Sequence, residues 1–99
     1  MYVYYVYDDE WSDINGEEQL KEFAMQQAIE FYNTTDSLKE IESNINCFIE
    51  EQFKDIVKEI FNRLSKSLST ANIYELFNVN IAIQVLKLRG FDVKIVYVY

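Results

Sequence analysis

The sequence predicts an α+β fold in which strands from the N- and C-terminal ends form a small sheet packed against three to four helices. Three observations lead to this prediction. Both ends of the chain are rich in tyrosine, valine and isoleucine, and the middle carries apolar residues at helical spacing. The chain also has no proline and only two glycines, so no linker divides its 99 residues. We therefore expect one domain over residues 1–99.

The first strand is expected over residues 1–7, where tyrosine and valine follow Met1 without interruption. This segment has no polar face, so we expect both of its faces to be covered. Residues 8–16 have the composition of an acidic loop. Its candidate interaction residues are Asp8, Asp9, Glu10 and Asp13.

The first helix should follow this loop. Asn15 and Glu18 stand three residues apart, as in a capping pair that opens a helix. The apolar stripe behind them fades near residues 33–35. We expect a helix between these limits.

The strongest pattern in the chain lies between Leu38 and Leu68, where apolar residues recur at helical spacing behind the capping pair Ser37 and Glu40. An unbroken helix over residues 37–67 would be about 45 Å long, longer than a domain of this size is wide. We expect it either to bend near residues 44–46 or to project.

Two ion pairs at four-residue spacing should support this helix, because in each the acid precedes the base. They are Glu50 with Lys54 and Glu59 with Arg63.

Residues 70–90 can be interpreted in two ways. Apolar residues alternate from Phe77 to Val85 as in a strand, whereas Asn72 with Glu75 indicates a helix start and Gly90 a helix end. We favour two short helices, over residues 71–77 and 80–89. After Gly90, residues 91–99 alternate at first and then become apolar, which predicts the C-terminal strand.

Two terminal strands alone would make a ribbon that is marginal in water and open at both edges. A second copy of the chain could cover these edges by adding its own terminal strand, which predicts a homodimer. The contact residues would be Tyr97, Val98 and Tyr99. The rival is a third strand from residues 79–85 of the same chain, which would weaken this argument.

Net charge and composition limit the catalytic and metal-binding functions that the chain could have. The net charge is −8, with no histidine and one cysteine. Residues 1–53 hold thirteen acids and two bases (net −11), and residues 54–99 hold four acids and seven bases (net +3). The carboxylates of the acidic loop could bind magnesium, but such a site needs further acids from another element and no second acidic cluster follows. We therefore favour a solvated loop. Cys47 lacks a histidine to activate it and is expected to be half-buried. We expect no metal, no cofactor and no catalysis.

Nucleic acid is a disfavoured partner, because the net field repels phosphate. Six basic residues of the second half could form a patch, but pairing on helix surfaces accounts for them. They are Lys54, Lys58, Arg63, Lys66, Lys87 and Arg89.

The chain resembles a group of viral proteins in its tyrosine-rich ends, Tyr2-Val-Tyr-Tyr-Val-Tyr7 and Lys94-Ile-Val-Tyr-Val-Tyr99, its acidic first half and its lack of proline and histidine. It is similar in these features to the small orphan proteins of filamentous viruses that infect hyperthermophilic, acidophilic archaea. The resemblance implies an α+β fold without close relatives, no assigned activity and tolerance of heat and acid. It also implies an accessory protein that acts by binding.

Three function classes follow. The leading one is a homodimeric, non-enzymatic protein–protein interaction module. The alternative is an inhibitor of a host defence nuclease complex, in which the acidic N-terminal half binds a basic host protein. The third is a metal-dependent nuclease. The start lacks the features of a signal peptide and no apolar run reaches the length of a membrane span, so we expect a protein of the host cytoplasm with no membrane partner.

Overall fold

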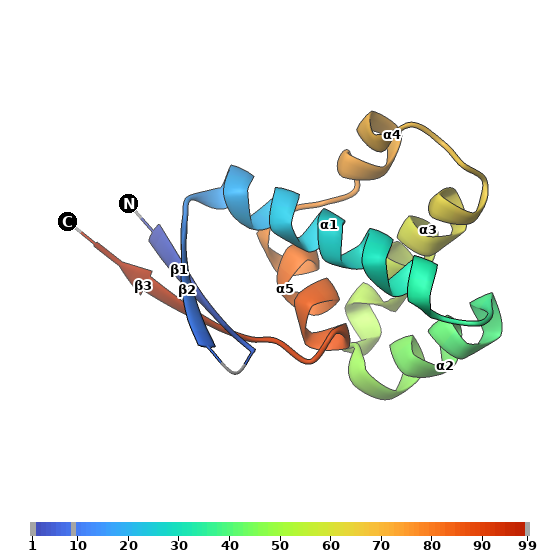
Figure 1. The fold of residues 1–99 in the computed structure, drawn as a ribbon, viewed down its shortest axis with the longest axis horizontal. Coiled ribbons are helices and arrows are strands. Elements are labelled where there is room, and N and C mark those ends of the chain that lie inside the picture. The colour runs from blue at the N-terminus through green and yellow to red at the C-terminus, as the bar shows by residue number, and fades with distance from the viewer. Residues whose placement is uncertain (1, 9, 99) are drawn as a thin grey trace.

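A computed structural model describes residues 2–8 and 10–98 and shows an α+β fold (Figure 1). The elements occur in the order β1 (Tyr2–Asp8), β2 (Glu10–Asn15), α1 (Glu17–Thr34), α2 (Leu38–Phe48), the 3₁₀ turn η1 (Glu51–Phe53), α3 (Lys54–Ser65), α4 (Thr70–Tyr74), α5 (Val79–Leu88) and β3 (Asp92–Tyr97). The predicted fold class is therefore confirmed.

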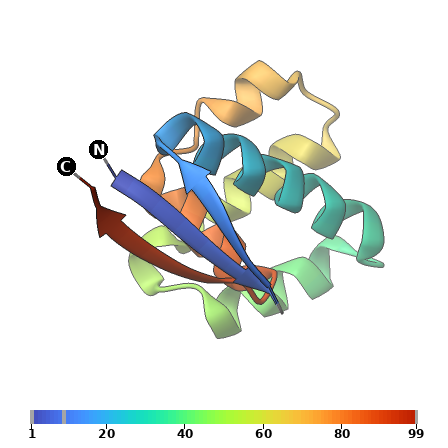
Figure 2. The ribbon, with the colours of Figure 1, turned by 60° about the vertical axis from the view of Figure 1, so that its left-hand side comes forward.

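The sheet is antiparallel and has the strand order β2-β1-β3, so the two chain ends pair with each other (Figures 1 and 2). The prediction of a two-stranded ribbon was wrong. The third strand is β2, which occupies the segment expected to be an acidic loop. The rival third strand over residues 79–85 was also wrong, because that segment lies in helix α5.

Helices cover only one face of the sheet (Figure 2). Tyr4 and Val6 of β1 point to this inner face, where each is 2 % exposed within the core. On the outer face Tyr5 is half-buried and Tyr7 is 36 % exposed. Val3, on the same outer face, is only 7 % exposed, so the expectation that β1 is covered on both faces holds for the inner face and for the Val3 end of the outer face.

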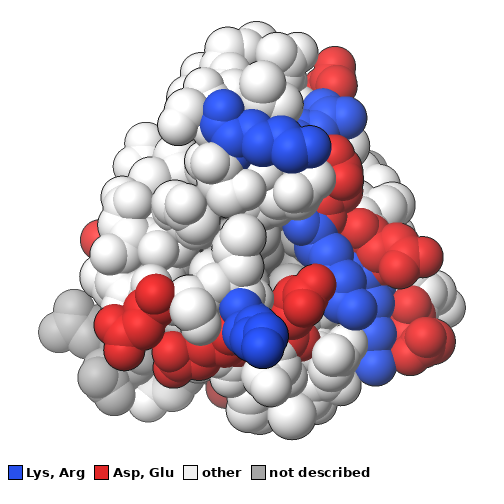
Figure 3. All heavy atoms as spheres, turned by 90° about the vertical axis from the view of Figure 1, so that its right-hand side faces the viewer, with Lys and Arg blue, Asp and Glu red and all other residues white. Residues whose placement is uncertain are grey.

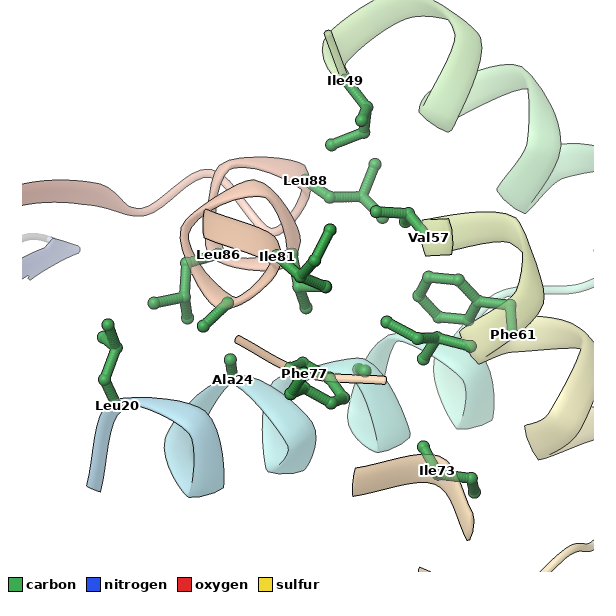
Figure 4. Packing of buried hydrophobic residues seen from close by; sticks show 14 of the residues in the cluster. Leu20, Ala24, Ile49, Val57, Phe61, Ile73, Phe77, Ile81, Leu86 and Leu88 are labelled. Atoms are coloured by element: carbon green, nitrogen blue, oxygen red, sulfur yellow. The ribbon is translucent and has the colours of Figure 1, made fainter. Parts of the chain in front are cut away.

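Helix α5 is the centre of the core. Within it only Asn80 and Lys87 are exposed, and their seven-residue spacing places them on one narrow side. The rest of its circumference packs against α1, α3 and the sheet (Figure 4). Ala24 and Ala28 of α1, both fully buried, let these two helices approach closely. A helix enclosed in this way has no polar face, which is why its residues imitate a strand pattern.

The long apolar segment after Ser37 breaks, but not near residues 44–46. Helix α2 ends at Phe48, and Ile49 adopts an extended conformation before η1 and α3. The buried side chain of Gln84, from α5, accepts a hydrogen bond from the Glu50 amide at 3.4 Å and its own amide donates to the Glu50 carboxylate at 3.5 Å. These bonds satisfy backbone and side-chain groups at the break, where a continuous helix would have outgrown the 42 Å long axis of the molecule.

The helix starts agree only partly with the expected capping pairs. The Ser37 hydroxyl accepts a hydrogen bond from the Glu40 amide at 3.3 Å, as predicted. Asn15, however, lies in β2, and α1 begins after Gly16 (φ 90°), with Gln19 accepting a hydrogen bond from the Asn15 amide.

The two short helices of residues 70–90 are present with shifted limits. Ser69, not Asn72, caps α4, and Asn78 caps α5 through a 2.8 Å hydrogen bond from the Ile81 amide. Gly90 follows α5 with φ 88°, a backbone conformation that favours glycine, and directs the chain into β3.

Of the two expected ion pairs, Glu59 with Arg63 is confirmed at 3.2 Å. The pair of Glu50 with Lys54 was wrong. Lys54 binds Glu51 at 2.9 Å instead, because the break after α2 turns Glu50 toward Gln84.

Truncating a core side chain should lower the free energy of unfolding far more than truncating a surface side chain. Phe61 is 2 % exposed, and replacing it with alanine should lower the free energy of unfolding by about 3–5 kcal/mol, since both transfer energy and a cavity are involved. Phe48 is 62 % exposed, so Phe48→Ala is the matched control and should cost no more than about 0.5 kcal/mol. Urea unfolding of both variants measures the difference, and equal losses would contradict this packing.

Candidate interaction surface at the sheet edge

The edge strand β3 has a neighbouring strand on one side only within the three-stranded sheet. Its register places Val93 opposite Val6, Ile95 opposite Tyr4 and Tyr97 opposite Tyr2. Residues directly opposite each other share a face of the sheet, so all of these side chains lie on the inner face. The inner face of β3 is therefore apolar along its whole length.

The helices do not reach the far end of this face. Tyr4 and Val6 are buried, but Tyr2 is 51 %, Ile95 47 % and Tyr97 53 % exposed. We call these three residues the overhang. Figures 1 and 2 show why they are exposed: the ends of β1 and β3 that carry both termini extend beyond the helices. The result is an apolar surface that continues the core outward along an edge strand.

The overhang is ordered by its own aromatic contact. The rings of Tyr2 and Tyr97 meet edge to face, with centroids 5.0 Å apart and an interplanar angle of 69°. Val98, the residue after β3, is 38 % exposed. Tyrosine offers a large contact area with few rotatable bonds, so little entropy is lost when such a surface is covered. Of the predicted contact residues, Tyr97 thus lies at this surface, Val98 follows it as an exposed residue, and Tyr99 is outside the described residues.

Two of the candidate acidic residues, Glu10 and Asp13, belong to β2, the opposite edge strand of the sheet. Asp13 is exposed on the outer face of β2, opposite Tyr5. Asp8 pairs with Glu10 where β1 and β2 meet, although only their backbone is described, and Asp9 lies outside the described residues. Among the side chains that the structure describes, which do not include those of residues 8–12, no three acidic or thiol groups gather closely enough to hold a metal ion.

Charged side chains elsewhere join helices to one another. Tyr74 of α4 donates a 2.6 Å hydrogen bond to Glu18 of α1, and Lys21 lies 3.1 Å from the same carboxylate and over the Tyr74 ring. The Tyr74 hydroxyl and then Lys21 lower the pKa of Glu18, and Glu18 raises the pKa of Tyr74 to about 12. This cluster fixes α4 against α1.

Arg63 makes the corresponding link between α3 and α4. Its guanidinium donates to Glu59 at 3.2 Å, to Glu75 at 2.6 Å and to the carbonyl of Asn72. The hydrogen bond from Arg63 is the main cause of the lowered pKa of Glu59. Every carboxylate in the two clusters has a partner, which is the pattern of a structural contact.

The basic residues of the second half do not form a surface of one sign. On the face built by the helical end of the molecule, lysines and arginines lie beside aspartates and glutamates (Figure 3). Lys54 and Arg63, two of the candidate nucleic-acid contacts, bind carboxylates.

Two further features have some properties of a binding or reactive site. A hollow of about 270 Å³ lies between α2 and α3. Its apolar floor of Ile41, Ile45 and Phe61 is at most 2 % exposed, and the exposed Leu38 and four charged side chains also line it, so the lining does not select one kind of ligand. Cys47 is exposed, not half-buried as expected, because it lies on the solvent side of α2.

Comparison with known proteins adds no relative: no family model matches this chain, and neither a curated protein nor a solved structure is significantly similar to it. Among the helices formed by the described residues, none is both long and apolar enough to cross a membrane.

The hydrogen bond from Tyr74 to Glu18 should make stability depend on pH at both extremes. Glu18 has a lowered pKa, so its contribution is present above the ordinary value of 4.5 and is lost as pH falls through the lowered pKa. Tyr74 has a raised pKa, so its contribution is present below 10.0 and is lost as pH rises toward about 12. Tyr74→Phe should therefore destabilise the protein most at neutral pH and least at both extremes.

Urea unfolding over a pH series checks this expectation. The control is a double-mutant cycle with Glu18→Ala, which removes the acceptor, so Tyr74→Phe should cost little at neutral pH in the Glu18→Ala background. A constant effect of Tyr74→Phe at every pH would show that the hydroxyl acts without Glu18.

Proposed function

We propose that this chain is a non-enzymatic interaction module that forms a homodimer by pairing β3 with β3 of a second copy. The observation that carries the proposal is the overhang, because exposed apolar side chains on an open edge strand are the usual template for strand addition. The resemblance to small viral proteins agrees with an accessory role of this kind, in which binding is the activity.

The charges of the two edge strands favour β3 over β2 as the contact. Among its six residues β2 carries Glu10 and Asp13 and no base, so two copies of it would bring like charges together. Strand β3 carries one acid, Asp92, and one base, Lys94, and has no net charge. Only the edge formed by β3 combines neutral charge with exposed apolar residues.

A second copy is the partner that this edge fits best. Antiparallel pairing of β3 with itself would extend the sheet to six strands in the order β2-β1-β3-β3-β1-β2, with the helices of both copies on one face. The exposed inner-face residues of each β3 would then face inner-face residues of the other β3. Exposed tyrosine and isoleucine side chains would be removed from water, which is the main driving force available at this edge.

The alternative function, inhibition of a host defence nuclease complex by the acidic first half, has weaker support. It needs a negative surface that imitates nucleic acid. Bases instead bind several of the acids of this half, as in the pairs of Lys21 with Glu18 and Lys54 with Glu51. A metal-dependent nuclease has still less support, because the described carboxylates do not converge.

A lysine at the overhang should dissociate the dimer. Tyr97→Lys places a charge in the apolar contact, so the dimerisation constant should weaken by at least about tenfold while the helix content stays unchanged. Light scattering should report a fall from two chains of 11.8 kDa toward one.

The matched control is Asp13→Lys, which places the same side chain on the opposite edge strand and should leave the mass of the dimer unchanged. An unchanged mass for Tyr97→Lys, with the control also unchanged, would contradict strand pairing at β3.

Ionic strength separates this proposal from its alternative. Apolar and backbone contacts are screened little, so raising the salt from about 0.05 M to about 0.5 M should change the dimerisation constant by less than about threefold. Capture of a basic host protein by the acidic half would instead weaken steeply with salt. Sedimentation equilibrium of the purified chain and affinity capture at both salt concentrations provide the two measurements.

A further inference from the structure

We infer that the two copies of β3 pair in a single register, in which Ile95 lies directly opposite Ile95 of the second copy on the twofold axis. This inference rests on the proposed homodimer and specifies its contact. Three properties of β3 select the register: the symmetry of antiparallel pairing, the length of the strand and the position of Lys94.

Symmetry limits the choices first. Side chains directly opposite each other in an antiparallel pair lie on the same face of the sheet, and a slip of one residue would reverse the faces. In a twofold dimer with one continuous sheet, the axis must therefore pass through a single residue position. The positions that leave room for pairing on both sides are Val93, Lys94, Ile95 and Val96.

Strand length removes two of these four. An axis at Val93 would pair only residues 92–94 of β3 with their copies, and an axis at Val96 only residues 95–97. An axis at Lys94 pairs residues 92–96, and an axis at Ile95 pairs residues 93–97. Because each paired residue adds to the backbone hydrogen-bond ladder, the two central registers are preferred.

Charge and exposure decide between the remaining two. An axis at Lys94 would place two ammonium groups directly opposite each other and would leave Tyr97 without an opposite residue in β3. An axis at Ile95 places Lys94 opposite Val96, where its aliphatic stem can cover the valine. On the inner face it pairs Tyr97 with Val93 and Ile95 with itself, so both exposed β3 residues of the overhang gain an apolar residue opposite them.

This register also continues the existing core. Val93 packs against the core of its own chain as a partly buried residue. Tyr97 of the second copy would lie opposite it and extend the apolar layer across the axis. A lysine on an edge strand usually discourages association. Here Lys94 instead disfavours the register whose axis passes through Lys94.

Cysteine cross-linking tests the register, because only the residue on the axis meets its own copy. The background is Cys47→Ser, since Cys47 is the only natural cysteine and is exposed. Ile95→Cys, Lys94→Cys and Val96→Cys are made in this background and oxidised with copper phenanthroline. Opposite residues in paired strands lie within the separation of about 4.4–6.8 Å between Cα atoms that a disulfide needs.

The expected result is a disulfide-linked dimer of Ile95→Cys that forms at least about tenfold faster than with either neighbouring variant alone. Mixing Lys94→Cys with Val96→Cys should restore fast cross-linking, because these two positions face each other across the axis. Light scattering before oxidation establishes that each variant is dimeric, and circular dichroism that each is folded.

The outcomes separate the two proposals. A dimer in which Lys94→Cys or Val96→Cys links to itself fastest, or in which Ile95→Cys shows no preference, would overturn the register and leave the homodimer in place. A chain that stays monomeric at every concentration tested would overturn the homodimer and the register together.

Discussion

The enclosure of helix α5 is the constraint on which the rest of the structure depends. Only Asn80 and Lys87 of this helix are exposed, so nearly its whole circumference has to be covered by other elements. Helices α1 and α3 and the inner face of the sheet provide this cover, and Gln84 of α5 also satisfies the break after α2. Strand β3 leaves α5 through Gly90, so the position of the edge strand follows from the position of the helix.

The same arrangement explains why the proposed contact lies at one end of the sheet. The helical layer covers the sheet where Tyr4 and Val6 lie, and stops before Tyr2, Ile95 and Tyr97. The apolar inner face of the sheet thus extends beyond the part that the helices cover. Covering that face removes apolar area from water, so association through it needs no charged partner and no cofactor.

The charged side chains have a different role from the one that the net charges of the two halves of the chain indicate. The first half of the chain is strongly acidic and the second half basic, which invites a function based on a long-range field. In the folded chain Glu18, Lys21 and Tyr74 hold α4 against α1, while Arg63 holds it against α3. Helix α4 has only five residues and a single buried one, Ile73, so these polar contacts contribute much of its attachment.

The sequence by itself determined the features that depend on neighbouring residues: the terminal strands, the cap at Ser37, the ion pair of Glu59 with Arg63 and the helix end at Gly90. Tertiary structure alone decided that residues 10–15 form a strand, that α2 ends at Phe48 where Gln84 reaches Glu50, and that the helices leave Tyr97 exposed on the edge strand. Periodicity and capping are local properties of the chain, whereas pairing partners and the reach of one layer over another depend on residues far apart in sequence.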